Sequence, residues 1–384
     1  MLLTAGTVAT GREVLRPGWI EVAGTAITAV GQGAPGRPVD HDLGAATVVP
    51  GFVDTHVHGG GGGSFSGGAA EAATVVALHR RHGTTSLVAS LVSEAPGDLV
   101  EQVVALREAV LSGLVAGIHL EGPWLAATRC GAHDPALLRD PDPGEVDRLL
   151  AAADGTIRMV TLAPERAGAL EAIRRIVGSG AVAAVGHTDA SYEQTRAAVA
   201  AGATVGTHLF NAMRPIHHRE PGPVIALLED PAVTVELIAD GVHLDAALFR
   251  FVSRSIGPDR VSLITDAMAA AGMADGTYRI GPLAVEVTEG VAHLAGTETI
   301  AGSTATMDRI FRFVVTHCGL PERDALALAV AQSSINPARA VGLPSPALVP
   351  GAVADLVVLD PNLSVSAVLC RGDWVDGRTP ISGV

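Results

Sequence analysis

The sequence predicts a parallel (β/α)₈ barrel of the TIM type together with a small β-sandwich domain built from both ends of the chain. From residue 52 onward, short apolar and β-branched runs alternate with longer amphipathic stretches, which is the pattern of strand–helix units. Polar residues of catalytic type stand where several of these runs end, as in barrel enzymes. Both termini instead alternate apolar and polar residues between glycine turns, as antiparallel strands do. A doubly wound open sheet is the alternative to the barrel.

The barrel strands are expected at eight short runs. The stretches between them read as helices, and two of these, AAEAATVVALHRRHG and SYEQTRAAVAAG, end in a glycine suited to close a helix. The expected strands are residues 52–57, 85–90, 115–121, 157–163, 182–187, 203–208, 233–239 and 261–267.

The terminal segments are each too short for a core of their own. Residues 1–50 contain WIEVAGTAITAVGQG, and residues 346–384 contain PGAVADLVVLDPNLSVSAVLCRGDWVDG. The economical prediction is that the two segments form one small β domain. Residues 51–345 then form the barrel, inserted between them.

Composition excludes several classes of function. The formal charge of −14 argues against nucleic-acid and anionic-membrane partners, since both need a basic face. All 26 basic residues are arginine, which rules out Schiff-base lysine chemistry and a carbamylated-lysine metal bridge. No apolar run approaches the roughly 20 residues that span a bilayer, and no signal peptide is evident. With three cysteines that cannot all pair, a cytoplasmic location is expected.

Histidines and carboxylates gather at one predicted rim of the barrel. His56 and His58 lie two apart at the end of a predicted strand, so their rings point to the same face. Because barrel active sites form at the carboxyl ends of the strands, other donors at strand ends are expected to converge with this pair. These are Glu121, His187, His208 and Asp266.

Nitrogen and carboxylate donors without thiolate fit Zn²⁺, and also Fe²⁺, Mn²⁺ or Co²⁺. Five protein ligands exceed the need of one catalytic ion, so one or two ions per subunit are expected. His56, His58 and Glu121 would hold one, and Glu121, His187 and His208 the other, with Glu121 as the bridge. Such a centre acidifies water, and Asp266 would act as general base and then acid.

These residues carry a resemblance to the amidohydrolase superfamily. PGFVDTHVHG, the glutamate, the two separated histidines and the late aspartate are its pattern. Within it, HLEGPW, GAHDP, GHTDAS, THLFNAM, REPG, IADGVHLD and LITDAM are similar to the N-acetylglucosamine-6-phosphate deacetylase family, over nearly the whole chain. The resemblance implies a hydrolase of amino-sugar and carbohydrate metabolism. It would release acetate from N-acetylglucosamine 6-phosphate and leave glucosamine 6-phosphate.

The resemblance also implies roles for individual residues. Asn211, the backbone at Ala212, and Arg219 would bind the phosphate, while His133 and His243 would contact the sugar or the polarised carbonyl. Part of the phosphate site comes from a neighbouring subunit in this family, which implies a homodimer or a dimer of dimers. An arginine is a bidentate phosphate partner, and backbone N–H groups at a strand-to-helix turn suit an anion, so both observations support the substrate.

Two alternative functions and the role of one cysteine stay open from sequence alone. Another amidohydrolase, acting on a cyclic amide, is one alternative, although many such enzymes need the lysine that this chain lacks. A metal-free scaffold that lost its chemistry is another. Cys130, nine residues after Glu121, is either a packing residue or part of a loop that closes a thiol over the substrate.

Overall fold

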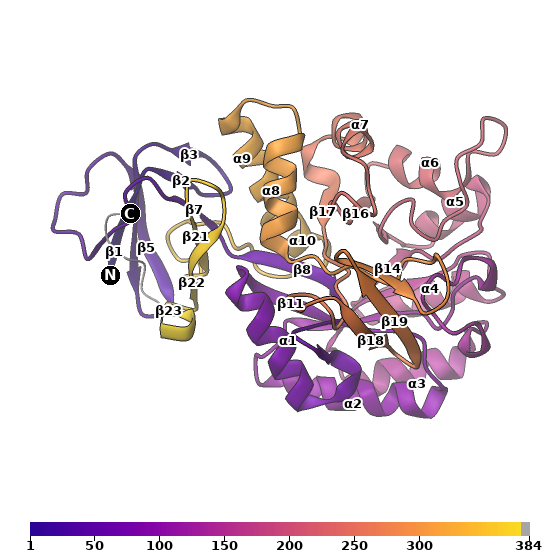
Figure 1. Ribbon diagram of the computed structural model, residues 1–384. Coiled ribbons are helices and arrows are strands. Elements are labelled where there is room, and N and C mark those ends of the chain that lie inside the picture. Colours follow the sequence, from indigo (N-terminus) through magenta and orange to yellow (C-terminus); the bar gives the residue numbers. More distant parts are fainter. Residues whose placement is uncertain (378–384) are drawn as a thin grey trace.

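The computed structural model describes residues 1–377 and shows two parts (Figure 1). A β-rich part lies at one end and contains the N-terminus. The larger part is an eight-stranded parallel sheet with helices around it. This arrangement confirms the predicted fold class.

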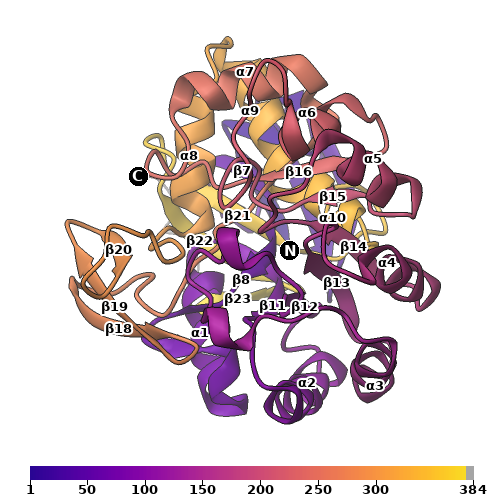
Figure 2. The same ribbon diagram turned by 90° about the vertical axis from the view of Figure 1, so that its right-hand side faces the viewer.

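The barrel strands follow one another in sequence order around the sheet, and every neighbouring pair is parallel. Seen from the end opposite the β-rich part, the helices surround the strands (Figure 2). The strands are β8 (Phe52–Val57), β11 (Thr84–Leu91), β12 (Gly117–Glu121), β13 (Ile157–Leu162), β14 (Val182–Val185), β15 (Val205–Gly206), β16 (Thr234–Leu237) and β17 (Val261–Leu263).

Several helices begin at a local signal in the sequence. In one of them, the Ser191 side chain accepts a hydrogen bond from the Gln194 N–H, and the Gln194 side chain accepts one from the Ser191 N–H, a capping box. Proline at the first turn starts others, because its missing N–H is not needed there. The helices are α1 (Ala69–Arg81), α2 (Pro96–Leu111), α3 (Pro143–Ala153), α4 (Ala169–Gly178), α5 (Tyr192–Ala200), α6 (Gly222–Glu229), α7 (Ala246–Ile256), α8 (Met307–His317), α9 (Glu322–Val330) and α10 (Asn336–Ala340).

The barrel closes between β8 and the segment after β17. The Asp266 N–H donates to the His56 carbonyl at 2.9 Å, and the His58 N–H donates to the Ala267 carbonyl at 2.9 Å. Val57 and Ala267 form an isolated parallel bridge at the same place. The seam of the barrel therefore joins the histidine pair directly to the segment that carries Asp266.

Several predicted strands are longer than the observed ones. β14 ends two residues before His187, β15 two residues before His208, and β17 three residues before Asp266. All three residues have a positive φ, of 46°, 24° and 48° respectively, which an extended strand cannot contain. The donor residues thus lie in turns just past the strands.

Strands from both termini build the β-rich part. β21 (Leu356–Leu359) pairs with β7 (Thr47–Pro50), although more than 300 residues separate them in the sequence. Side chains from two sheets share one core, which includes Leu3, Ile20 and Leu369. One sheet is β5 (Ala26–Gln32), β4 (Gly18–Ala23), β1 (Leu2–Ala5) and β6 (His41–Asp42). The other is β23 (Asp373–Trp374), β22 (Val365–Cys370), β21, β7, β2 (Thr7–Ala9) and β3 (Val14–Leu15).

A three-stranded antiparallel sheet between β17 and α8 was not predicted. It consists of β18 (Gly276–Ile280), β19 (Leu283–Thr288) and β20 (Val291–Leu294), and it has a small core of its own around Val285. A short hairpin, β9 (Gly59–Gly60) and β10 (Gly63–Ser64), lies within the glycine-rich turn after β8. Within residues 1–377, no helix combines the length and apolar character needed to cross a membrane.

Replacing Phe311 by alanine should lower the free energy of unfolding by about 3–5 kcal/mol, because a fully buried aromatic side chain leaves a cavity. Phe311 lies on α8 and packs on Phe52 of β8 with ring centroids 5.2 Å apart. Phe251 on α7 is 58% exposed and is the matched control. Phe251→Ala should change the free energy by less than about 0.5 kcal/mol. Denaturant unfolding measures both, and equal losses would contradict this packing.

Candidate metal centre and active site

Residues from five strands converge at the carboxyl rim of the barrel. His56 and His58 come from β8 and the residue after it, and Glu121 is the last residue of β12. His187, His208 and Asp266 follow their strands in the left-handed conformation, which turns each side chain back over the barrel mouth. Such backbone costs of order 1–3 kcal/mol per residue and is concentrated at functional sites.

Glu121 lies at the centre of this group and is almost fully buried. Its Oε1 lies 2.9 Å from His208 Nε2, 3.1 Å from His187 Nε2 and 3.3 Å from His56 Nε2, and its Oε2 lies 3.1 Å from His58 Nε2. Burial opposes its ionisation, but His56 and His187 outweigh burial and hold the pKa of Glu121 well below its usual value. One carboxylate thus faces both histidine pairs.

Asp266 faces the first histidine pair from the opposite side. Its Oδ1 lies 3.3 Å from His58 Nε2 and 3.4 Å from His56 Nε2. Burial would raise the pKa of Asp266, but the two histidines lower it below its usual value. Asp266 is therefore ionised at neutral pH and able to accept a proton.

The donor atoms are spaced as ligands of a shared cation. His56 Nε2 and His58 Nε2 lie 3.1 Å apart, as do His187 Nε2 and His208 Nε2. Around a tetrahedral ion with bonds of 2.0–2.1 Å, neighbouring donors are about 3.3 Å apart. One set of mutually close donors is His56, His58, Glu121 and Asp266, and a second is Glu121, His133 and His187. The residues present therefore fit a divalent cation.

The hydrogen bond at the ring nitrogen that points away from Glu121 determines whether a histidine can be a metal ligand. His187 Nδ1 faces the Arg129 carbonyl at 2.8 Å; because a carbonyl only accepts, Nδ1 carries the proton and Nε2 presents a lone pair. His133 is the opposite case. Its Nδ1 accepts the Ser93 N–H at 3.3 Å, so Nε2 carries the proton toward Glu121 Oε2 at 3.2 Å. His133 is thus a hydrogen-bond donor and not a ligand, and burial lowers its pKa to about 4.

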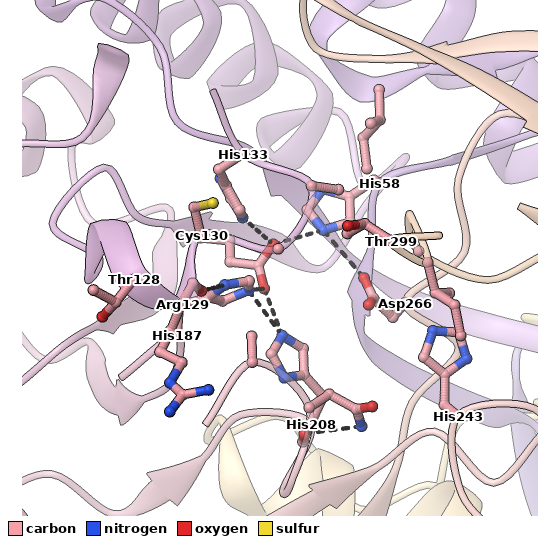
Figure 3. A pocket seen from close by; sticks show the side chains of 18 of the residues that line it. His58, Thr128, Arg129, Cys130, His133, His187, His208, His243, Asp266 and Thr299 are labelled. Atoms are coloured by element: carbon pink, nitrogen blue, oxygen red, sulfur yellow. Dashed lines mark hydrogen bonds and ion pairs between the residues drawn. The ribbon is translucent and has the colours of Figure 1, made fainter. Parts of the chain in front are cut away.

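A pocket of about 540 Å³ opens over these donors, and several labelled side chains in Figure 3 point into it. His243 lines one side, with its Nδ1 2.8 Å from Asp240 Oδ2. Burial opposes protonation of His243, but Asp240 outweighs it and raises the pKa of His243. Asn211 and Ala212 line another part of the wall, where φ is positive at Ala212 (50°) and at Phe210 (79°). Backbone turns that contain left-handed residues can present N–H groups to an anion.

The structure brings together all but one of the predicted site residues. Arg219 lies outside the pocket of its own chain, on an exposed loop, with its Nη1 2.7 Å from His218 Nε2. Cys130 lines the pocket as a half-buried free thiol beside Gly131 and His133.

Sequence reasoning missed three groups at the site. Glu236, on β16, is buried beside His56, and only its place on a predicted strand could have pointed to it. Arg129 lines the pocket and pairs with Asp189 at 2.8 Å. The segment after β20 closes the mouth with Glu298 and Thr299.

His119, within the HLEGP segment, supports His56 from below. Its ring packs edge-on against His56 with centroids 4.4 Å apart. The Val57 N–H donates to Ser90 Oγ at 3.0 Å. The same Ser90 Oγ lies 2.9 Å from His119 Nδ1, and His119 Nε2 lies 2.8 Å from Thr161 Oγ1. Burial lowers the pKa of His119 well below its usual value, and the ring is neutral. Hydrogen bonds at both ring nitrogens thus fix this ring.

The barrel and the donors at its rim define the class of protein: a barrel enzyme whose site suits divalent cations. Residues 47–375 match the model of the amidohydrolase family. This chain belongs to that family.

Relatives within the family are closely similar over most of their length. An N-acetylglucosamine-6-phosphate deacetylase from Bos taurus is 37% identical over 87% of this chain and 84% of the relative. An N-acetylgalactosamine-6-phosphate deacetylase from Escherichia coli O157:H7 is 36% identical over 87% and 88%. A variant of the Mycobacterium smegmatis N-acetyl-D-glucosamine-6-phosphate deacetylase, solved in complex with N-acetyl-D-glucosamine 6-phosphate, has 64% identity and a TM-score of 0.97, and covers 98% of this chain and 99% of its own.

Glu121→Gln should weaken metal binding more than about 100-fold, because an amide removes the charge that faces both histidine pairs; outer residues typically cost 10–100-fold. Glu145→Gln is the matched control, since Glu145 is also buried but lies on α3 and pairs with Arg139. Elemental analysis and competition with a chelator measure the bound metal. A full complement of metal in Glu121→Gln would contradict the centre described above.

Proposed function

We propose that this protein hydrolyses the acetamide of N-acetyl-D-glucosamine 6-phosphate to D-glucosamine 6-phosphate and acetate. The observation that carries the proposal is one pocket with a cluster of metal-ligand donors at its floor, an ionised aspartate beside them and the turn at Asn211 and Ala212 in its wall. The relatives support it as well, since both carbohydrate substrates in their names carry an N-acetyl group and a 6-phosphate.

A divalent cation, most readily Zn²⁺, would be held in one or two positions by His56, His58, Glu121, His187 and His208. When bound, such cations polarise a carbonyl and bring the pKa of water from about 16 toward about 7. The donor atoms meet at the floor of the pocket, so an acetamide there would lie within reach of Asp266.

Asp266 is the acid/base group in this proposal. It is ionised, so it takes the proton from the water that attacks the acetamide carbon. When the carbon–nitrogen bond breaks, the same carboxyl group returns that proton to the leaving nitrogen. The products are then the free amine and acetate, and Asp266 is ionised again.

Two histidines hold the substrate in this proposal. His133 lines the pocket, and its Nε2–H, which faces Glu121 Oε2 in the free protein, would donate to an oxygen of the substrate when one is bound. His243 has its Nδ1–H bound to Asp240, which leaves Nε2 for a sugar hydroxyl. Both rings are fixed by hydrogen-bond partners outside the pocket. Substrate binding therefore costs little conformational entropy in these two side chains.

The phosphate is assigned to the turn at Asn211 and Ala212. The Arg219 loop lies outside the pocket of its own chain, and we infer that it reaches the phosphate of a neighbouring subunit in a homodimer. The division of the chain at residues 50 and 346 into a β domain and a barrel, and a cytoplasmic location, are further parts of the proposal.

The test is acetate release from three sugars: N-acetylglucosamine 6-phosphate, N-acetylgalactosamine 6-phosphate and N-acetylglucosamine. The first should react fastest, and the sugar without phosphate should lose at least about 100-fold in kcat/KM, because two or more charge-assisted hydrogen bonds of about 1.5–3 kcal/mol each are lost. Chelation should abolish release and added Zn²⁺ should restore it. Equal rates with and without the phosphate would overturn the substrate assignment, and hydrolysis of a cyclic ureide instead would favour another amidohydrolase.

Asp266→Asn should lower kcat by about 10²–10⁴-fold, because the amide can no longer accept the proton of the attacking water. KM should change little, since Asp266 does not hold the substrate in this proposal. Steady-state kinetics and elemental analysis on the same preparation check both points. A variant with nearly full kcat and full metal content would contradict the role of Asp266.

A further inference from the structure

Glu236 is a buried carboxyl group that has, among the described residues, no arginine near it and a single histidine partner. It lies on β16 inside the barrel, and its relative exposure is 1%. Within residues 1–377, His56 is the only basic side chain with a nitrogen within 4 Å of its oxygens. Burying a carboxylate costs several kcal/mol unless its neighbours compensate for the lost hydration, so the few neighbours of Glu236 deserve a functional explanation.

Glu236 contacts the histidine pair through two adjacent residues of β8. Its Oε2 lies 3.4 Å from His56 Nδ1, and its Oε1 accepts the Thr55 hydroxyl at 3.0 Å. A bulge makes this double contact, because two residues of β8 face the single residue Val88 of β11. The neighbouring residues Thr55 and His56 can therefore both reach one carboxylate.

His56 is the only one of the four histidines in the two pairs whose far side meets a carboxylate. His187 donates instead to a neutral carbonyl. The Nδ1 atoms of His58 and His208 are buried and have no hydrogen-bond partner within residues 1–377. The two halves of the centre therefore differ in their outer neighbours. Among the described residues, only the His56–His58 half has a carboxylate, Glu236, next to the outer nitrogen of a ligand histidine.

We propose that Glu236 is a positioning residue that makes the His56–His58 half of the centre bind its cation. It holds the proton on His56 Nδ1, so that Nε2 offers its lone pair toward Glu121 and Asp266. Its charge also makes the imidazole a stronger donor, as carboxylates do behind metal-bound histidines. The inference rests on the proposed metal centre and not on the identity of the sugar.

The test is titration of the metal-free protein with Zn²⁺ against a competing chelator, for wild type, Glu236→Gln and Ser262→Ala. The wild type should take up two ions per subunit. Glu236→Gln keeps the length of the side chain but removes its charge; it should bind one ion as the wild type does and the other about 10–100-fold more weakly. With Co²⁺ in place of Zn²⁺, half of the visible absorption should then appear only at higher cobalt concentration.

Ser262→Ala is the matched control. Ser262 is the direct neighbour of Glu236 on β17, is fully buried, and its hydroxyl has no hydrogen-bond partner within residues 1–377. It should bind both ions with wild-type affinity. The inference is overturned if Glu236→Gln binds both ions within two-fold of wild type, if it weakens both equally, or if the wild type takes up a single ion. In that last case, acetate release by the one-ion enzyme would leave the proposed function intact.

Discussion

The closure of the barrel between β8 and the segment after β17 is the contact on which the site depends. The hydrogen bonds from Asp266 N to His56 O and from His58 N to Ala267 O place Asp266 against the histidine pair. Asp54 strengthens the same seam, since its carboxyl group accepts the Thr265 hydroxyl at 2.5 Å. More than 200 residues separate these strands. Without the seam, Asp266, to which we assign the acid/base role, would not share a site with His56 and His58.

The interior beneath the site is polar where most barrels are filled by Val, Ile and Leu. The ring of His119 and the hydroxyls of Ser90 and Thr161 are hydrogen-bonded to one another, which offsets the cost of burying them. Glu121, Asp266 and Glu236 add carboxylates to the same region, close to histidines and without an arginine within 4 Å among the described residues. A cation at the rim would offset this excess of negative charge. The stability of this part of the fold would then depend on the bound cation.

The histidines at the site differ in protonation because the groups that bond their outer ring nitrogens differ. A carbonyl behind His187 and a backbone N–H before His133 produce opposite tautomers, so one ring offers a lone pair and the other a proton. Neither assignment depends on the ring itself. The backbone groups of Arg129 and Ser93 therefore determine which ring nitrogen of each histidine carries the proton at this rim.

The sequence by itself determined the barrel, the shared β domain and six of the donor residues. Strand–helix alternation has a period that is visible locally, and the carboxyl ends of parallel strands meet at one rim whatever the details, so His56, His58 and Asp266 could be assigned to it. Only the tertiary structure revealed Glu236, the tautomer of His133 and the β18–β20 sheet over the mouth. All three features depend on contacts between side chains from different strands and loops. The spacing of residues along one strand does not predict such contacts. Arg219 is a further example. Its segment is recognisable in the sequence, but only the folded structure shows that it lies outside the pocket of its own chain.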